Sequence, residues 1–98
     1  MDGINDRTEG AVEMTFTIKN KLGLHARAAS MFVQVASGFD AEVFILKNDQ
    51  EVNGKSIMGI LILAAPKGAE ITVKAIGSDA ESAVDALGRL IEDRFGEE

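Results

Sequence analysis

The chain contains no cysteine, no tryptophan and no tyrosine, and it has a single histidine among its 98 residues. Without cysteine it has neither a disulfide framework nor a thiolate metal site, which is compatible with a reducing compartment. A single histidine would leave carboxylates to supply nearly all the ligands of a metal ion. We therefore expect no metal and no cofactor.

Acidic residues outnumber basic ones: the chain has 16 Asp+Glu and 10 Lys+Arg, which gives a formal net charge of −6. An acidic surface repels the phosphate backbone of nucleic acids. The absence of tryptophan and tyrosine also removes side chains on which bases usually stack. We expect no nucleic-acid partner.

No apolar run is long enough to cross a membrane. The longest, residues 60–65, is far shorter than the roughly 20 residues that a transmembrane helix requires. Residues 1–10 lack the basic and apolar segments of a signal peptide, and they are polar without a period. We expect a disordered leader at 1–10 and one domain at 11–98, in a cytoplasmic protein without membrane insertion.

Hydrophobic periodicity predicts the order βαββαβα. Strict alternation over residues 12–19 is typical of a half-buried strand. Its buried face would carry Val12, Met14, Phe16 and Ile18. The remaining strands are predicted at 41–47, 50–53 and 70–76, and helices at 26–36, 57–63 and 79–94. One sheet covered on one face by helices is the simplest architecture, because each strand has a single apolar face.

Two helix starts depend on capping residues. The apolar run after Ser56 fits a strand as well as a helix, and Ser56 as an N-cap favours the helix. Ser78 followed by Glu81 is typical of a capping box at the last helix. We expect the acidic residues of that helix to form only a solvated face; they are Asp79, Glu81, Asp85, Glu92 and Asp93.

The only histidine, His25, stands where the first strand pattern ends and the first helix pattern begins. A neutral imidazole is a competent nucleophile near neutral pH, and the free N–H groups of a helix start can hold phosphoryl oxygens. Arg27 can pair with the same oxygens, and Gly23 permits a sharp turn. Small residues leave the helix start sterically open: Ala26, Ala28 and Ala29. This pattern indicates a phosphoryl-group site; the alternative is a histidine that only caps the helix.

Two motifs resemble those of the HPr family, the histidine-containing phosphocarriers of the bacterial phosphoenolpyruvate-dependent sugar phosphotransferase system. The first is Leu22-Gly23-Leu24-His25-Ala26-Arg27, and the second is Asn53-Gly54-Lys55-Ser56-Ile57-Met58-Gly59. The resemblance covers residues 12–95. It implies an α+β fold, an open-faced β-sandwich in which a four-stranded antiparallel sheet is covered on one face by three helices.

By this resemblance, His25 takes a phosphoryl group on Nδ1 from phosphorylated Enzyme I and passes it to EIIA-type acceptor proteins. The chain would then be a carrier and not an enzyme. Arg27 would contact the phosphoryl group, and Ser56 would be a regulatory site for an HPr kinase/phosphorylase. The resemblance also implies an apolar docking patch made of Ile57, Met58 and Leu61. We expect a monomer, because a relay protein must expose its site repeatedly.

The sequence departs from the family at Ala28, where family members usually have proline. A proline in the first helical turn fixes φ and lacks an N–H that would be unpaired anyway. Ala28 therefore loosens the helix start and adds one donor.

Four alternatives stay open. Ser56 is also an ordinary N-cap, and the apolar residues after it also fit a buried stripe. The carrier chemistry could serve a nitrogen-type regulatory relay. A non-catalytic βα binding module, with His25 incidental, is the alternative from another class.

Overall fold

The computed structural model describes residues 10–97, so the expected leader at 1–10 lies outside them except for Gly10. Within these residues the order is βαββαβα, as the sequence predicts. The strands are β1 (Ala11–Thr17), β2 (Glu42–Lys47), β3 (Gln50–Asn53) and β4 (Glu70–Ile76). The α-helices are α1 (Ala26–Ala36), α2 (Ile57–Leu63) and α3 (Ala80–Glu92), and a 3₁₀ turn follows at Arg94–Gly96.

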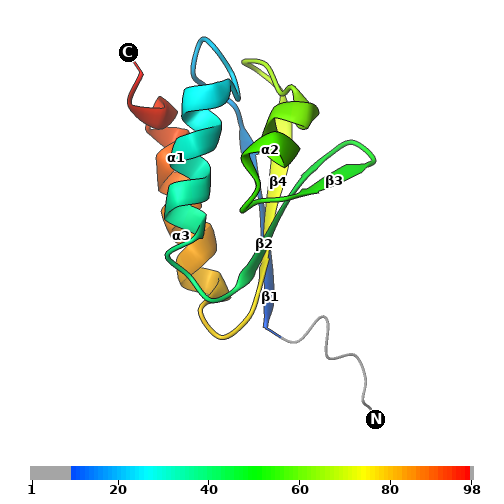
Figure 1. Cartoon of the computed structure of the whole chain (residues 1–98), viewed down its shortest axis with the longest axis vertical. Coiled ribbons are helices and arrows are strands. Elements are labelled where there is room, and N and C mark those ends of the chain that lie inside the picture. The colour runs from blue at the N-terminus through cyan, green and yellow to red at the C-terminus, as the bar shows by residue number, and fades with distance from the viewer. Residues whose placement is uncertain (1–9, 98) are drawn as a thin grey trace.

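The strands form one antiparallel sheet in the order β1-β4-β2-β3. The helices cover one face of this sheet, as Figure 1 shows. The central strand β4 alternates accordingly: Ile71, Val73 and Ala75 are buried, whereas Thr72 and Lys74 lie on the uncovered face. The expected open-faced sandwich is confirmed.

The core lies between the sheet and the helices. Phe32 of α1, Ile60 of α2 and Leu87 of α3 are fully buried, and each such side chain contributes about 1.5–3 kcal/mol relative to an exposed one. Ala28 and Ala29 are also fully buried. The prediction that they leave the helix start open is therefore wrong, because their small size allows α1 to pack closely on its neighbours.

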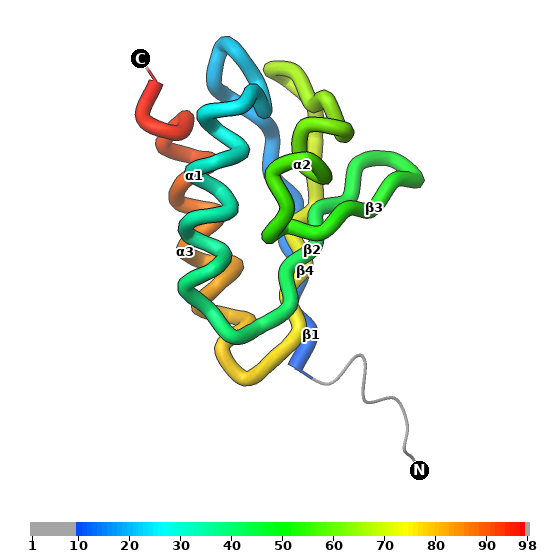
Figure 2. The backbone as a smooth tube through the Cα atoms, in the orientation of Figure 1, coloured from blue at the N-terminus to red at the C-terminus, as the bar shows by residue number. Residues whose placement is uncertain are grey.

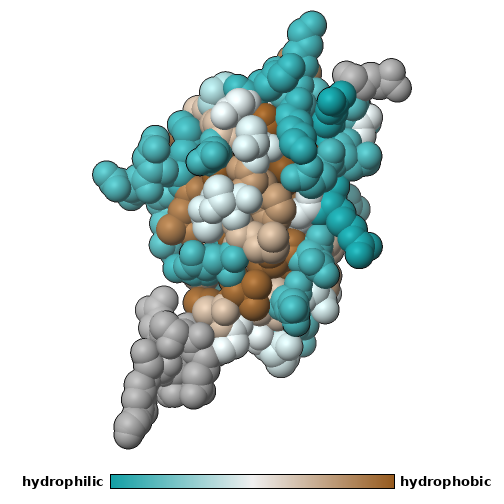
Figure 3. Space-filling model, turned by 180° about the vertical axis from the view of Figure 1, so that it is seen from behind, coloured by the Kyte–Doolittle hydropathy of each residue, from teal (hydrophilic) through white to brown (hydrophobic). Residues whose placement is uncertain are grey.

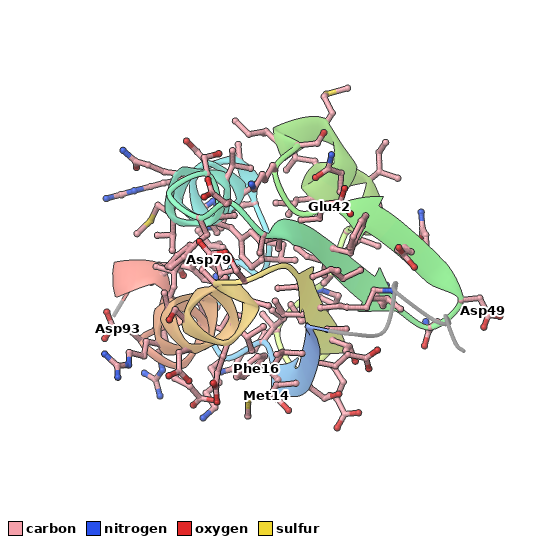
Figure 4. All side chains as sticks on the ribbon, turned by 90° about the horizontal axis from the view of Figure 1, so that it is seen from below. Met14, Phe16, Glu42, Asp49, Asp79 and Asp93 are labelled. Atoms are coloured by element: carbon pink, nitrogen blue, oxygen red, sulfur yellow. The ribbon has the colours of Figure 1, made fainter. Side chains whose placement is uncertain are left out.

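The edge strand β1 is only partly covered by α3. Phe16 packs against α3 where Gly88 leaves room, since a β-carbon there would lie 2.6 Å from the Phe16 ring. Met14 is 50% exposed and lines a cleft of about 200 Å³ between β1 and α3 (Figure 4). The prediction that Met14 lies on a buried face is wrong for this reason. Seen from behind, a strip of apolar surface lies between hydrophilic side chains (Figure 3).

The start of α3 differs from the prediction. Its N-cap is Asp79, and no side chain caps the helix, so the capping box of Ser78 and Glu81 does not form. Asp79 instead accepts hydrogen bonds from the N–H groups of Asp40 and Ala41, at 2.9 and 2.8 Å. The Asp40 N–H is the main cause of the lowered pKa of Asp79. Asp79 thus ties the loop before β2 to α3 and is not merely solvated.

The end of α3 also differs. The helix ends at Glu92 and not at Arg94, because Arg94 and Phe95 take left-handed backbone conformations with φ of 59° and 54°. The side chain of Phe95 remains buried in the core. The chain consequently turns back toward the start of α1, as the tube in Figure 2 shows.

Candidate functional site

The loop between β1 and α1 is bound to the segment that follows α2. Leu24 donates its N–H to the carbonyl of Ala65 at 2.9 Å. Gly23 has a φ of +69°, and a β-carbon on it would lie 2.5 Å from the Ala65 oxygen and 2.9 Å from Cα of Pro66. Only glycine fits this close approach. The predicted turn at Gly23 is confirmed, and it fixes the position of the residue that follows Leu24.

That residue is His25, the N-cap of α1. Its backbone is extended (φ −84°, ψ −178°), and its carbonyl accepts the first helical hydrogen bond, from Ala29 at 2.8 Å. The N–H of Arg27 donates to the ring atom Nδ1 at 3.3 Å. The side chain is 26% exposed. His25 therefore caps the helix and also presents part of its ring to solvent.

A cation and free amides surround the start of α1. Arg27 is exposed and has no ion-pair partner among residues 10–97. The first turn of α1 contains no acidic residue. The first amides of a helix lack intrahelical acceptors, and the helix dipole favours an anion at this end. The arrangement is suited to holding a small anionic group beside His25.

The second ring nitrogen of His25 meets a carboxylate from the other end of the chain. Nε2 lies 2.6 Å from Oε2 of Glu97. Asn20 donates to the same oxygen at 3.0 Å, and the N–H of Leu22 donates to Oε1 at 3.5 Å. Partial desolvation raises the pKa of Glu97, but the hydrogen bonds from His25, Asn20 and Leu22 bring it below its ordinary value. Glu97 is accordingly ionised at neutral pH.

Ser56 is the N-cap of α2, as predicted. Its backbone is extended, and its Oγ accepts a hydrogen bond from the N–H of Gly59 at 3.0 Å. The preceding turn is closed by Asn53, whose side-chain oxygen accepts from the N–H of Lys55 at 2.8 Å. The segment 53–59 therefore forms a capped helix start with a half-buried serine hydroxyl.

Similarity to known proteins decides the family. The family model described as the PTS HPr component phosphorylation site matches residues 12–93. Phosphocarrier protein HPr of Neisseria meningitidis serogroup A is 51% identical over 86 residues, which cover 88% of this chain and 97% of the relative. The chain belongs to the HPr family. Members of this family are phosphocarriers of the phosphotransferase system and not enzymes in the usual sense.

HPr structures agree with the fold. The crystal structure of HPr-C-His from Thermoanaerobacter tengcongensis matches with a TM-score of 0.86 and 49% identity, covering 89% of this chain and 98% of that one. Phosphocarrier protein NPr of Shewanella violacea is 42% identical over 86 residues, covering 88% of this chain and 94% of the relative. The family thus includes carriers under both names.

The apolar residues of α2 divide between core and surface. Ile60 and Leu63 are buried, whereas Ile57 and Met58 are 41% and 69% exposed. Leu61 is half-buried and packs against the core. Ile62, which the sequence patterns do not single out, is 61% exposed. Positions 58 and 62 lie one helical turn apart and share the outward face. The exposed apolar surface of α2 therefore consists of Ile57, Met58 and Ile62.

Two observations concern metals and membranes. Residues 10–97 contain no group of three or more histidine, cysteine, aspartate or glutamate side chains able to hold a metal ion. Of the helices that the structure describes, none has both the length and the apolar character that spanning a membrane requires.

His25 and Arg27 lie at one helix start and Gly23 in the turn before it, as the sequence predicts, but no sequence pattern indicates Glu97 or Asn20. Neither belongs to a local motif, because their contacts with His25 and Gly23 arise from the folding of distant segments. The one local signal for this segment is the glycine at Gly96, which follows Phe95 and has a φ of +77° in the structure. A glycine there indicates a helix end and not where the chain goes next.

Proposed function

We propose that the protein accepts a phosphoryl group on Nδ1 of His25 from phosphorylated Enzyme I and passes it to EIIA-type acceptors of the sugar phosphotransferase system. The observation that carries the proposal is the partly exposed ring of His25 at the N-cap of α1, with Nδ1 beside the Arg27 amide. Membership of a phosphocarrier family supports it. The protein would act in the cytoplasm.

In this step the lone pair of Nδ1 forms the bond to phosphorus while the bond between phosphorus and the donor breaks. Such a transfer depends on positioning and on charge stabilisation. The amides of the first α1 turn would hold phosphoryl oxygens, at about 0.3–1 kcal/mol for an exposed anion. The guanidinium of Arg27 adds a charge-assisted contact. The group is then held without being trapped, as a relay requires.

We propose Ser56 as a regulatory phosphorylation site for an HPr kinase/phosphorylase. Its Oγ already accepts the Gly59 N–H, so an added phosphate would sit at a helix start, where negative charge is favourable. The fold would tolerate the modification. Its charge, about −1.5 to −2, would instead repel an acidic partner.

We propose the exposed part of α2 as the surface for partner docking. Ile57 and Met58 are exposed, and their apolar side chains give a partner something to bury. Leu61 is half-buried on the same helix and would support these two side chains from below. Leu22 is 66% exposed in the loop before His25 and would extend the contact toward the histidine.

The second candidate is a nitrogen-type regulatory relay. It is favoured by the likeness to NPr of Shewanella violacea, at 42% identity over 86 residues. The chemistry at His25 would be the same, and only the acceptor would differ.

The test is incubation with phosphoenolpyruvate and Enzyme I. A carrier gains an acid-labile phosphate, and the His25→Ala variant does not. If the wild-type protein takes up no phosphate, the carrier proposal fails and the non-catalytic binding module becomes the favoured alternative. Offering the phosphorylated protein EIIA-type acceptors of sugar transport and of nitrogen regulation then separates the two relays.

Oligomeric state is part of the same experiment. We propose a monomer, whereas a crystal structure of an HPr dimer is known from Thermoanaerobacter tengcongensis, with a TM-score of 0.72 to this chain. Light scattering at the assay concentration distinguishes the two states.

A further inference from the structure

We propose that Glu97 is a positioning residue for His25: its carboxylate accepts the proton on Nε2, which directs the lone pair to Nδ1 and offsets the positive charge that the ring gains during transfer. This inference rests on the proposed carrier function and adds a residue to it.

The contacts of the ring fit only one neutral tautomer. Nε2 lies 2.6 Å from the carboxylate of Glu97, and an ionised carboxylate can only accept a hydrogen bond. Nε2 must therefore carry the proton. At the other nitrogen, Arg27 presents a backbone N–H at 3.3 Å, which can only donate. Nδ1 must therefore carry the lone pair.

Glu97 is held in place and not merely nearby. Asn20 is fully buried, and its side-chain amide donates both to the carbonyl of Gly23 at 2.7 Å and to Glu97 Oε2 at 3.0 Å. The side-chain amide of Asn20 thus fixes both the loop before His25 and the carboxylate of Glu97. The other carboxylate oxygen, Oε1, accepts a hydrogen bond from the N–H of Leu22 at 3.5 Å.

The backbone before Glu97 is bent for this contact. Arg94, Phe95 and Gly96 have φ of 59°, 54° and 77°, and left-handed backbone is costly for residues other than glycine. Burial of Phe95, which is 3% exposed, offsets that cost. The bend carries the chain from the end of α3 to the start of α1, which lie side by side in Figures 1 and 2. Unfavourable backbone that places one carboxylate on the site is typical of functional positions.

The charge change during transfer explains what the carboxylate would do. When Nδ1 uses its lone pair to bond phosphorus, the ring keeps the proton on Nε2 and becomes cationic. A fixed carboxylate on Nε2 stabilises that cation, as the aspartate does in serine protease triads. In the onward step the electron pair of the N–P bond returns to Nδ1 and the ring becomes neutral again. Glu97 therefore assists both directions without taking up a proton.

The experiment compares three variants with the wild-type protein. Glu97→Ala removes the acceptor, and Glu97→Gln keeps an oxygen acceptor without the charge. Glu81→Gln is the matched control, because it removes an exposed acid from the first turn of α3 that takes no part in the Glu97 contacts. Two quantities are measured: the imidazole nitrogen chemical shifts of the unphosphorylated protein by NMR, and the initial rate of phosphoryl transfer from phosphorylated Enzyme I.

We expect Glu97→Ala to change the imidazole nitrogen shifts toward those of a mixture of tautomers. It should also slow phosphoryl transfer about 10-fold, because one charge-assisted hydrogen bond is lost. Glu97→Gln should keep the tautomer and slow transfer less, and Glu81→Gln should change neither. An unchanged transfer rate in Glu97→Ala overturns the inference. Slower transfer with unchanged nitrogen shifts also overturns it, because the loss would then lie in docking. If the wild-type protein takes up no phosphate, the carrier proposal fails, while the tautomer measurement still reports on Glu97.

Discussion

The carbonyl of Ala65 occupies the space that a β-carbon on Gly23 would need, at 2.5 Å, and it accepts the N–H of Leu24 at 2.9 Å. The carbonyl oxygen of Ala65 therefore fixes the loop that carries His25 to the segment that follows α2. Any side chain at Gly23 must push these two segments apart.

We predict that Gly23→Ala lowers the free energy of unfolding by about 2 kcal/mol or more, because left-handed backbone costs roughly 1–2 kcal/mol and the clash adds to it. Urea denaturation measures the change. Gly68→Ala is the control, since Gly68 also has a positive φ, +92°, but a β-carbon there has no neighbour within 4 Å. Equal losses in the two variants would show that the approach to Ala65 does not matter.

Arg27→Ala is expected to slow phosphoryl transfer about 10-fold, because a charge-assisted contact to the phosphoryl group is lost. Stability should change by less than about 0.5 kcal/mol, since Arg27 is exposed. Transfer assays and thermal melts measure the two effects. Arg89→Ala, at an exposed position of α3, is the control. Transfer at the wild-type rate in Arg27→Ala would contradict the proposed role of Arg27.

The acid dependence of stability should report the Glu97 contacts. Desolvation raises the pKa of Glu97, but hydrogen bonds from His25, Asn20 and Leu22 lower it below the ordinary 4.5. A carboxyl whose pKa is lower when folded stabilises the protein above its unfolded value, and this contribution is lost as pH falls through the folded value.

We therefore expect the wild-type protein to be more stable than Glu97→Gln by a constant amount near neutral pH, and the gap to shrink at pH values below 4.5. Urea midpoints over a pH series measure it. Glu81→Gln serves as the control, because the hydrogen bonds that hold Glu97 do not involve it. If the stability difference between the wild-type protein and Glu97→Gln does not change at acid pH, the pKa of Glu97 is not lowered in the folded state.

Ser56 should respond differently to two substitutions. Ser56→Ala removes the acceptor for the Gly59 N–H and should cost about 1 kcal/mol. Ser56→Asp keeps a good N-cap and adds charge, so it should leave the melting temperature nearly unchanged and slow transfer to His25. Thermal melts and transfer assays provide both readings. Equal transfer rates in Ser56→Asp and wild type would count against regulation here.

Met58→Ala should weaken binding to Enzyme I by about 1–2 kcal/mol without destabilising the fold, because Met58 is 69% exposed on α2. Titration calorimetry measures the affinity. Met14→Ala is the matched control: Met14 is also half-exposed, but on β1 beside α3. If both variants weaken binding equally, α2 is not the docking surface.

Sequence patterns predicted what depends on local interactions. The helix from Ala26 to Ala36, the N-cap at Ser56 and the turn at Gly23 all follow from neighbours within a few residues, and all are confirmed. The errors arise where distant segments compete. The carboxylate of Asp79 accepts from the loop before β2 and does not cap its own helix. Met14 is exposed because α3 covers only part of β1.

The candidate site shows the same division. His25 and Arg27 are two positions apart, so one helix start brings them together. Glu97 reaches His25 from 72 positions away, and no spacing rule relates the two. The buried amide of Asn20 likewise has a meaning only once the C-terminal turn is in place. These contacts become visible only in three dimensions.

The bend at residues 94–96 also decides where an affinity tag can be attached. The structure places Glu97 beside the ring of His25, so a peptide joined after Glu97 would emerge next to the histidine and would crowd the proteins that we propose to dock there. The beginning of β1 lies at the opposite end of the molecule, as Figure 1 shows. Fluorophores, purification handles and immobilisation chemistry therefore belong at the N-terminal end.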